Sequence, residues 1–274
     1  MDINSAKKLN NGVEIPCLGF GVFRASAADT EKSVLWALEA GYRHIDTAKI
    51  YGNEAAVGKA VKESGIDRAD IFITTKLWNE DMRAGKQREA FAQSLKALDT
   101  DYVDLYLIHW PVENFAASWK ILEEFYAAGN AKAIGVSNFQ THHLDALLQT
   151  AKVVPAVNQV ESHPYLTQKP LMAYCESKGI ACEAWGPLGG QGANIMDEAV
   201  IKDLATKYGR TPAQIILRWD LQRGIIPLPK SVHRERVFSN ADLYDFALEE
   251  ADMTAINSMN RNLRLGADPD NFNF

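Results

Sequence analysis

Short apolar runs alternate with amphipathic stretches along most of the chain. The runs have the length of buried strands, and the stretches between them carry apolar residues at helical spacing. Strands are expected at residues 18–23, 43–46, 71–76, 103–109, 133–138, 156–161, 181–185 and 225–229. Strands that alternate with helices predict a parallel sheet, and eight such units without a long linker predict closure into a barrel.

Helices are expected in the intervening segments. The first would be capped by Ser26 or Asp29 and would stop at Gly41. The others would cover residues 54–62, 88–98, 116–128, 142–149, 171–178, 197–208, 212–223, 235–243 and 249–260. Ahead of the first strand, Asn11 and Gly12 predict a two-residue hairpin turn within residues 8–15. The sequence therefore predicts an α/β fold, a single (β/α)8 TIM barrel with an N-terminal β-hairpin and two extra helices, as one domain over residues 1–274.

An open, doubly wound sheet is the alternative arrangement of the same elements. Such a sheet is expected to carry a G-x-G-x-x-G fingerprint after its first strand. The chain has only a fragment of that pattern, in residues 19–21, and the barrel is therefore favoured.

Polar residues of four kinds lie at or just beyond the ends of three consecutive expected strands. Asp46 ends the second strand, Lys76 the third and His109 the fourth, and Tyr51 lies on the loop after Asp46. Because barrel strands converge at their carboxyl ends, these side chains are expected to meet. Singly, each has an ordinary structural explanation, such as a helix cap, a loop lysine or a packed histidine. Together they predict a catalytic site.

The four residues suit proton exchange with a carbonyl or alcohol oxygen. A nearby ammonium lowers the pKa of a phenol, and a carboxylate keeps the ammonium charged and in place. Tyr51, Lys76 and Asp46 therefore predict a tuned acid/base, with His109 orienting a substrate oxygen. These groups supply no electrons, so the hydride must come from a cofactor.

The later strands offer groups that suit a nicotinamide cofactor. Ser137, Asn138 and Gln159 provide hydroxyl and amide partners for a carboxamide, and Trp185 provides a flat face for stacking. The glycines of residues 189–192 permit close approach of a pyrophosphate.

The last strand ends in a cluster suited to an anion. Lys230 and Arg236 supply two cations, and Ser231, Val232 and Asn240 accompany them. Arginine binds phosphate bidentately, so this cluster predicts a pocket for a ribose 2′-phosphate and favours NADP over NAD.

Several motifs together resemble the aldo-keto reductase family, nearly end to end, and within it the 2,5-diketo-D-gluconate reductases. They are residues 41–48 (GYRHIDTA), 51–54 (YGNE), 74–78 (TTKLW), 101–111 (DYVDLYLIHWP), 134–139 (IGVSNF) and 229–232 (PKSV). The resemblance implies a catalytic tetrad of Asp46, Tyr51, Lys76 and His109, with Tyr51 as the proton donor in NADPH-dependent carbonyl reduction. It also implies cofactor contacts from Ser137, Asn138, Gln159, Trp185, Gly186, Leu188, Lys230, Ser231, Val232, Arg236 and Asn240. A substrate pocket would be formed by Phe23, Ile50, Trp78, Trp110 and His109.

The chain departs from the family pattern at three positions. Gly186 stands where serine is common, His233 where threonine or arginine is usual, and Ser239 where an acid is often found.

Two other functions use the same fold. A metal-dependent barrel hydrolase would need several histidine ligands at strand ends, and only His109 and His163 qualify, so no metal is expected. His44 is interpreted as a packing residue, and His142 and His143 as surface residues. The second alternative is an NADP(H)-binding sensor barrel with little turnover, which an intact tetrad argues against.

Composition limits the partners and the compartment. A net charge of −6 argues against nucleic acid and anionic membranes, and no apolar run is long enough to cross a bilayer. Cys17, Cys175 and Cys182 lack metal-like spacing and are interpreted as reduced thiols. These features predict a cytoplasmic protein, and the resemblance implies a monomer that acts on a small carbonyl compound. The tail, residues 261–274, is expected to fold over the mouth of the site, where Arg261 or Arg264 would attract an acidic substrate.

Overall fold

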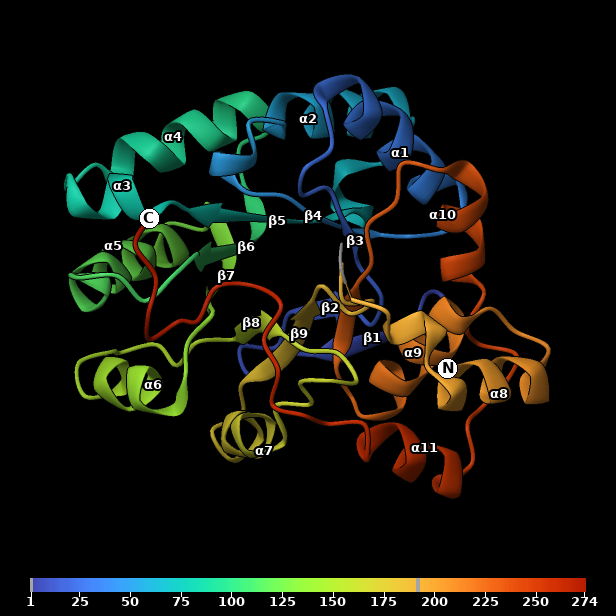
Figure 1. Cartoon of the computed structure of the whole chain (residues 1–274). Coiled ribbons are helices and arrows are strands. Elements are labelled where there is room, and N and C mark those ends of the chain that lie inside the picture. The colour runs from blue at the N-terminus through green and yellow to red at the C-terminus, as the bar shows by residue number, and fades with distance from the viewer. Residues whose placement is uncertain (1, 191–192) are drawn as a thin grey trace.

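Eight parallel strands form one sheet in the computed structural model, which describes residues 2–190 and 193–274. Neighbouring strands follow one another in sequence (Figure 1). They are β3 (Phe20–Gly21), β4 (His44–Asp46), β5 (Phe72–Leu77), β6 (Val103–Ile108), β7 (Ala131–Ser137), β8 (Val157–Glu161), β9 (Ala181–Trp185) and β10 (Ile226–Leu228). The main-chain nitrogens of Gly19 and Gly21 donate to the oxygens of Pro227 and Pro229, over 3.1 and 3.0 Å. These bonds join the first strand to the last, and the predicted barrel is confirmed.

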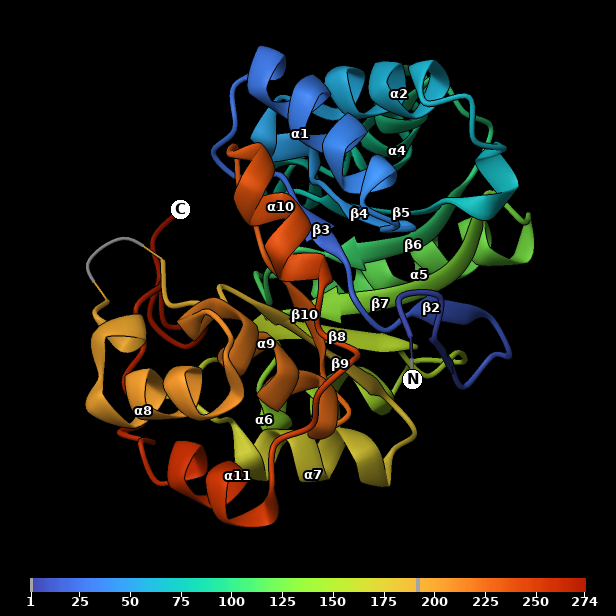
Figure 2. The ribbon, with the colours of Figure 1, turned by 90° about the vertical axis from the view of Figure 1, so that its right-hand side faces the viewer.

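Helices surround the barrel. The eight that follow the strands are α1 (Ala27–Glu39), α2 (Glu54–Glu63), α4 (Gln87–Leu98), α5 (Phe115–Ala127), α6 (Thr141–Leu148), α7 (Lys169–Ser177), α9 (Pro212–Gln222) and α10 (Arg234–Ala241). The two extra helices are α8 (Ala199–Tyr208) and α11 (Glu250–Asn257), which lie together beside α9 (Figures 1 and 2). Ser26 caps α1 by accepting a hydrogen bond from the main chain of Asp29.

Four short helical turns were not expected from the sequence. They are α3 (Asn79–Arg83) and three 3-10 turns, η1 (Lys49–Tyr51), η2 (Arg68–Asp70) and η3 (Ile195–Asp197). A single turn is too short to show a helical repeat of apolar residues. One of them, η1, places Tyr51 at the mouth of the barrel.

The hairpin of β1 (Ala6–Lys8) and β2 (Glu14–Pro16) lies at the end of the barrel away from the C-terminus (Figure 2). The predicted two-residue turn is wrong. Leu9 N donates to Val13 O, and Gly12 N donates to Leu9 O, so three residues form the loop. Of the three loop residues, 10–12, only Gly12 has a positive φ, of 91°. This conformation matches a three-residue hairpin loop that ends in a bulge.

The core has two layers, inside and outside the barrel wall. Every residue of β5 and β6 is buried, as expected when both faces of a parallel sheet are covered. Leu9 and Ile15 of the hairpin pack with Leu105 and Leu107 and fill the amino-terminal end of the barrel. The opposite end is therefore the one open to a ligand. Within the described residues, no helix is long and apolar enough to span a membrane.

Candidate active site

A cavity of about 730 Å³ lies at the carboxyl ends of the strands. Most of the residues predicted for the site line it, namely Phe23, Asp46, Ile50, Tyr51, Trp78, His109, Trp110, Ser137, Asn138, Gln159, Trp185, Gly186, Leu188 and Lys230. Lys76 is fully buried beside it. The cavity lining does not include Ser231, Val232, Arg236 or Asn240, which lie further along the chain after β10.

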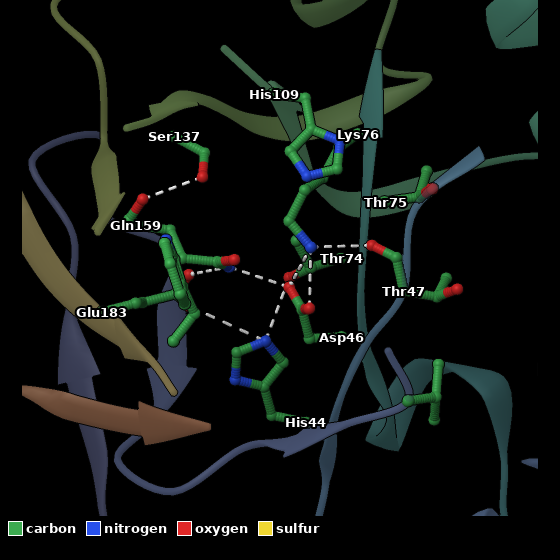
Figure 3. Close-up of polar contacts among 12 residues, drawn as sticks. His44, Asp46, Thr47, Thr74, Thr75, Lys76, His109, Ser137, Gln159 and Glu183 are labelled. Atoms are coloured by element: carbon green, nitrogen blue, oxygen red, sulfur yellow. Dashed lines mark hydrogen bonds and ion pairs between the residues drawn. The ribbon is translucent and has the colours of Figure 1, made fainter. Parts of the chain in front are cut away.

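Lys76 and Asp46 form a buried ion pair between β5 and β4 (Figure 3). The Nζ atom of Lys76 lies 2.7 and 2.8 Å from the two carboxylate oxygens, and it also donates to the main-chain oxygen of Thr47 over 2.9 Å. Burial opposes the charge on Lys76, but Asp46 and Tyr51 outweigh it and raise the pKa of the amine. The ammonium is therefore held charged and fixed, as predicted.

Tyr51 lies above this pair on η1, and the centre of its ring is 5.2 Å from Nζ of Lys76. Lys76 acts to lower the pKa of the phenol, as expected, but burial is the larger effect and Asp46 adds to it, so the pKa is raised. The prediction of a lowered pKa is wrong, because a buried phenolate loses more hydration than one ammonium restores. The phenol consequently keeps its proton at neutral pH.

His109 follows β6 and contacts the rings of Tyr51 and Trp78 at centroid distances of 5.8 and 5.2 Å. Burial and then Lys76 hold the pKa of His109 well below its usual range. The imidazole is therefore neutral at pH 7. Its Nδ1 atom is buried and has no hydrogen-bond partner among the described residues.

A second buried carboxyl group, which sequence reasoning missed, lies below the ion pair. Gln159 donates from Nε2 to Asp46 Oδ2 and to Glu183 Oε2, over 2.8 Å in each case (Figure 3). Burial and the charge of Asp46 raise the pKa of Glu183 to about 8. His44 lies 3.7 Å from Glu183 and 3.0 Å from the hydroxyl of Thr74, inside the barrel. A charged residue inside the apolar run 181–185 was the signal in the sequence.

The residues proposed to bind the carboxamide of the cofactor are joined to one another by hydrogen bonds. Ser137 Oγ donates to the main-chain oxygen of Gln159, and Asn138 Nδ2 donates to Ser137 Oγ. Trp185 Nε1 donates to Asn138 Oδ1 over 2.8 Å. Since both amide hydrogens of Gln159 are used, its Oε1 is left as an acceptor for a bound group.

The loop after β9 forms one wall of the cavity. Gly186 and Gly189 have positive φ values of 60° and 81°, and Gly189 N donates to Gly186 O. A Cβ atom at Gly189 would lie 2.6 Å from Cδ1 of Ile195, so this turn requires glycine. The predicted pyrophosphate loop continues through residues 191 and 192, which lie outside the described part of the chain.

The two predicted cationic side chains follow β10, and of these Lys230 lines the cavity. Lys230 and Arg236 are exposed, whereas Ser231 and Asn240 are buried. Arg236 and Asn240 are one helical turn apart on α10. Arg24, a further cation that sequence reasoning missed, lines the cavity with a φ of 57°.

The tail contributes the remaining wall, as expected for a segment that folds over the mouth. Leu265, Gly266, Ala267 and Phe274 line the cavity, and their roles were not identified from the sequence. The expected roles of Arg261 and Arg264 are not supported. Arg261 pairs with Glu198 over 2.6 Å, Arg264 lies 3.8 Å from Asp268, and neither arginine lines the cavity.

One group of potential metal ligands occurs among the described residues, formed by His142, His143 and Asp270. His142 is exposed as expected, but His143 is only partly exposed and packs against Phe139. Nδ1 of His143 accepts a hydrogen bond from the main chain of Gln140, so in the neutral ring Nε2 carries the proton. That nitrogen lies 3.5 Å from Asp270 Oδ1, and because it carries the proton it is not free to bind a metal.

The sequence and the fold are similar to those of known reductases. Residues 18–261 match the Aldo/keto reductase family. A glyoxal reductase of Bacillus subtilis (strain 168) is 48% identical over 269 residues, which cover 97% of this chain and 97% of the relative. Methylglyoxal reductase DkgA of Escherichia coli (strain K12) is 46% identical over 268 residues, again covering 97% of each chain. The crystal structure of a Bombyx mori aldo-keto reductase in complex with NADP has a TM-score of 0.93 at 36% identity, covering 98% of this chain and 97% of that one.

Proposed function

This chain belongs to the aldo/keto reductase family, and we propose that it reduces small carbonyl compounds to alcohols with Tyr51 as the proton donor. It is an NADP-dependent oxidoreductase. The observation that supports the proposed role of Tyr51 is the placement of its protonated phenol, the charged Lys76 and the neutral His109 around one cavity.

The residues present fit the cofactor. Gln159 keeps one free acceptor for a carboxamide, and Trp185 offers a half-buried ring at the cavity wall. Within residues 2–190 and 193–274, the side-chain nitrogens of Lys230 and Arg236 make no hydrogen bond or ion pair, which suits a phosphate. When bound, NADPH supplies the hydride that reduces the carbonyl carbon.

The protein's own residues would then handle the proton. Tyr51 would donate its phenolic proton to the carbonyl oxygen as negative charge develops there. Lys76 is already charged and would stabilise the phenolate that remains, while Asp46 keeps the ammonium in place. The neutral imidazole of His109 would donate a hydrogen bond to the same oxygen and fix the orientation of the substrate.

The cavity favours small substrates with an apolar part. Phe23, Ile50, Trp78 and Trp110 line it, and Phe23 and Ile50 are 52% and 47% exposed at its rim. Candidate substrates are glyoxal, methylglyoxal, 2,5-diketo-D-gluconate, β-keto esters and simple aldehydes. The reductase names of the two bacterial relatives support the first two. We further expect a monomer that acts in the cytoplasm and binds no nucleic acid.

The test is NADPH oxidation, followed by absorbance, with a panel of these carbonyl compounds. Tyr51→Phe removes the proton and keeps the ring, so we expect kcat to fall by at least about 100-fold with little change in the Kd of NADPH. Turnover by Tyr51→Phe at the wild-type rate would refute the role of Tyr51. Tight NADPH binding without turnover of any carbonyl would instead favour a sensor.

A further inference from the structure

Glu161, the last residue of β8, attaches the C-terminal segment to the barrel. Its side chain is buried, and Oε1 accepts hydrogen bonds from the main-chain nitrogens of Leu265 and Gly266, over 2.6 and 3.1 Å. His163 lies 2.9 Å from the same oxygen. A buried carboxylate that accepts two successive main-chain N–H groups forms charge-assisted hydrogen bonds, the stronger kind.

The attached segment lies directly against Trp185. Glu161 and Trp185 are partners in the register of β8 and β9. A Cβ atom built at Gly266 would lie only 2.3 Å from Cη2 of Trp185, so the tail packs its backbone onto the edge of the indole. The indole nitrogen is bonded to Asn138. The ring is therefore held between a hydrogen bond on one edge and the tail on the other.

The same segment continues across the mouth of the barrel and ends beside α3 (Figure 1). The ring of Phe274 stacks on Trp78 with an interplanar angle of 7° and meets Trp110 edge to face. The main-chain oxygen of Phe274 accepts from Asn79 and Arg83, over 3.2 to 3.3 Å. The tail therefore completes the aromatic wall of the cavity.

The other polar attachment between these two ends is weaker. Asp270 contacts His142 and His143, but Asp270 and His142 are 50% and 63% exposed. Exposed ion pairs contribute little, because water competes for both charges. Among the described residues, the contact made by Glu161 is the one in which a buried carboxyl group holds residues 264–274.

We propose that Glu161 is a positioning residue, which fastens residues 264–274 over the cavity and thereby sets the angle of Trp185 and the place of Phe274 in the substrate wall. The consequence for catalysis rests on the proposed function. The attachment itself does not, since it is a contact between two segments of the chain.

The first test measures the attachment by hydrogen–deuterium exchange at the amides of Leu265 and Gly266 in the full chain. In Glu161→Ala we expect these amides to exchange at least about tenfold faster than in the wild type, while strands β5 and β6 keep their protection. Glu161→Gln retains an acceptor oxygen and should restore most of the protection. Asp270→Asn, which removes an exposed contact of the same tail, is the matched control and should change exchange at these two amides less than threefold. Wild-type exchange in Glu161→Ala would overturn the proposal.

The second test measures the effect on the site. We expect Glu161→Ala to raise the KM for the carbonyl substrate about tenfold while kcat changes less than threefold, with recovery in Glu161→Gln. Gly266→Ala displaces the tail from Trp185 and from Glu161 but keeps the Glu161 side chain, and it should raise KM in the same way even if Glu161→Ala fails to fold. An unchanged KM in Gly266→Ala would overturn the positioning role. Absence of turnover in the wild type would refute the proposed function while leaving the exchange result interpretable.

Discussion

Gln159 donates one amide hydrogen to Asp46 over 2.8 Å and so connects β8 to the end of β4. These strands lie on different sides of the barrel, 113 residues apart in the chain. The bond links the residues expected to hold the cofactor to those expected to move the proton. A substitution among the cofactor-binding residues should therefore also affect the residues that transfer the proton.

The ion pair of Lys76 and Asp46 should contribute to both stability and catalysis. Removing one partner leaves a buried charge without its counterion, so we expect Lys76→Met to lower the free energy of unfolding by about 3–5 kcal/mol. The same change should lower kcat by at least about 100-fold, because no ammonium then stabilises the phenolate. Urea unfolding and NADPH oxidation measure the two effects. The double variant with Asp46→Asn should lose less stability than the sum of the single variants.

An exposed pair provides the control for this experiment. Lys62 and Asp99 lie 3.0 Å apart, but their side chains are 77% and 69% exposed. Lys62→Met should change the free energy of unfolding by less than about 1 kcal/mol. If Lys76→Met were no more destabilising than Lys62→Met, the prediction that the buried pair stabilises the fold would be wrong.

Glu183 should make the protein less stable as the pH rises. Its pKa is raised to about 8 in the folded state by burial and by Asp46, above the ordinary value of 4.5. The folded state therefore binds more protons than the unfolded state between these values, and its stability falls as the pH rises from about 4.5 to about 8. The slope from one such group is at most about 1.4 kcal/mol per pH unit.

Glu183→Gln isolates this contribution. The amide keeps the size of the side chain and does not titrate, so the free energy of unfolding of the variant should fall less than that of the wild type between pH 5 and pH 8 (about three units). Buried groups outside this cluster, such as Asp220, titrate in both proteins and cancel in the comparison. Parallel curves for the two proteins would contradict the raised pKa of Glu183.

Arg236 should distinguish the two nicotinamide cofactors. If its guanidinium binds the 2′-phosphate, Arg236→Ala should weaken NADPH binding by about 10–100-fold, the range for a lost charged hydrogen bond, and leave NADH binding nearly unchanged. Fluorescence titration gives both Kd values. Arg234→Ala is the control, because Arg234 lies on the same helix but pairs with Glu39 over 2.6 Å. Equal losses for NADPH and NADH would contradict a phosphate contact.

The sequence by itself determined the barrel and the strand ends that carry the site residues. Alternating strand and helix patterns are local properties, and barrel topology brings strand ends together whatever their distance in the chain. Asp46, His109 and Gln159 could therefore be assigned to one mouth before any coordinates, and all three line the cavity. Short elements such as η1 were missed, because one turn carries no repeat.

Only the tertiary structure decided the electrostatics and the closure of the site. The pKa of Tyr51 depends on how much water burial removes. This effect outweighs that of the neighbouring ammonium, so the pKa is raised and not lowered as the pairing with Lys76 predicted. The place of Phe274 depends on contacts made far away in the chain, and nothing in residues 261–274 predicts them. The need for glycine at position 58 also depends on a distant segment. A Cβ atom added at Gly58 would lie 2.3 Å from the main-chain oxygen of Leu98, where α2 packs against α4. Burial, long-range contact and close packing arise only when distant segments meet, and so they cannot be read from local sequence.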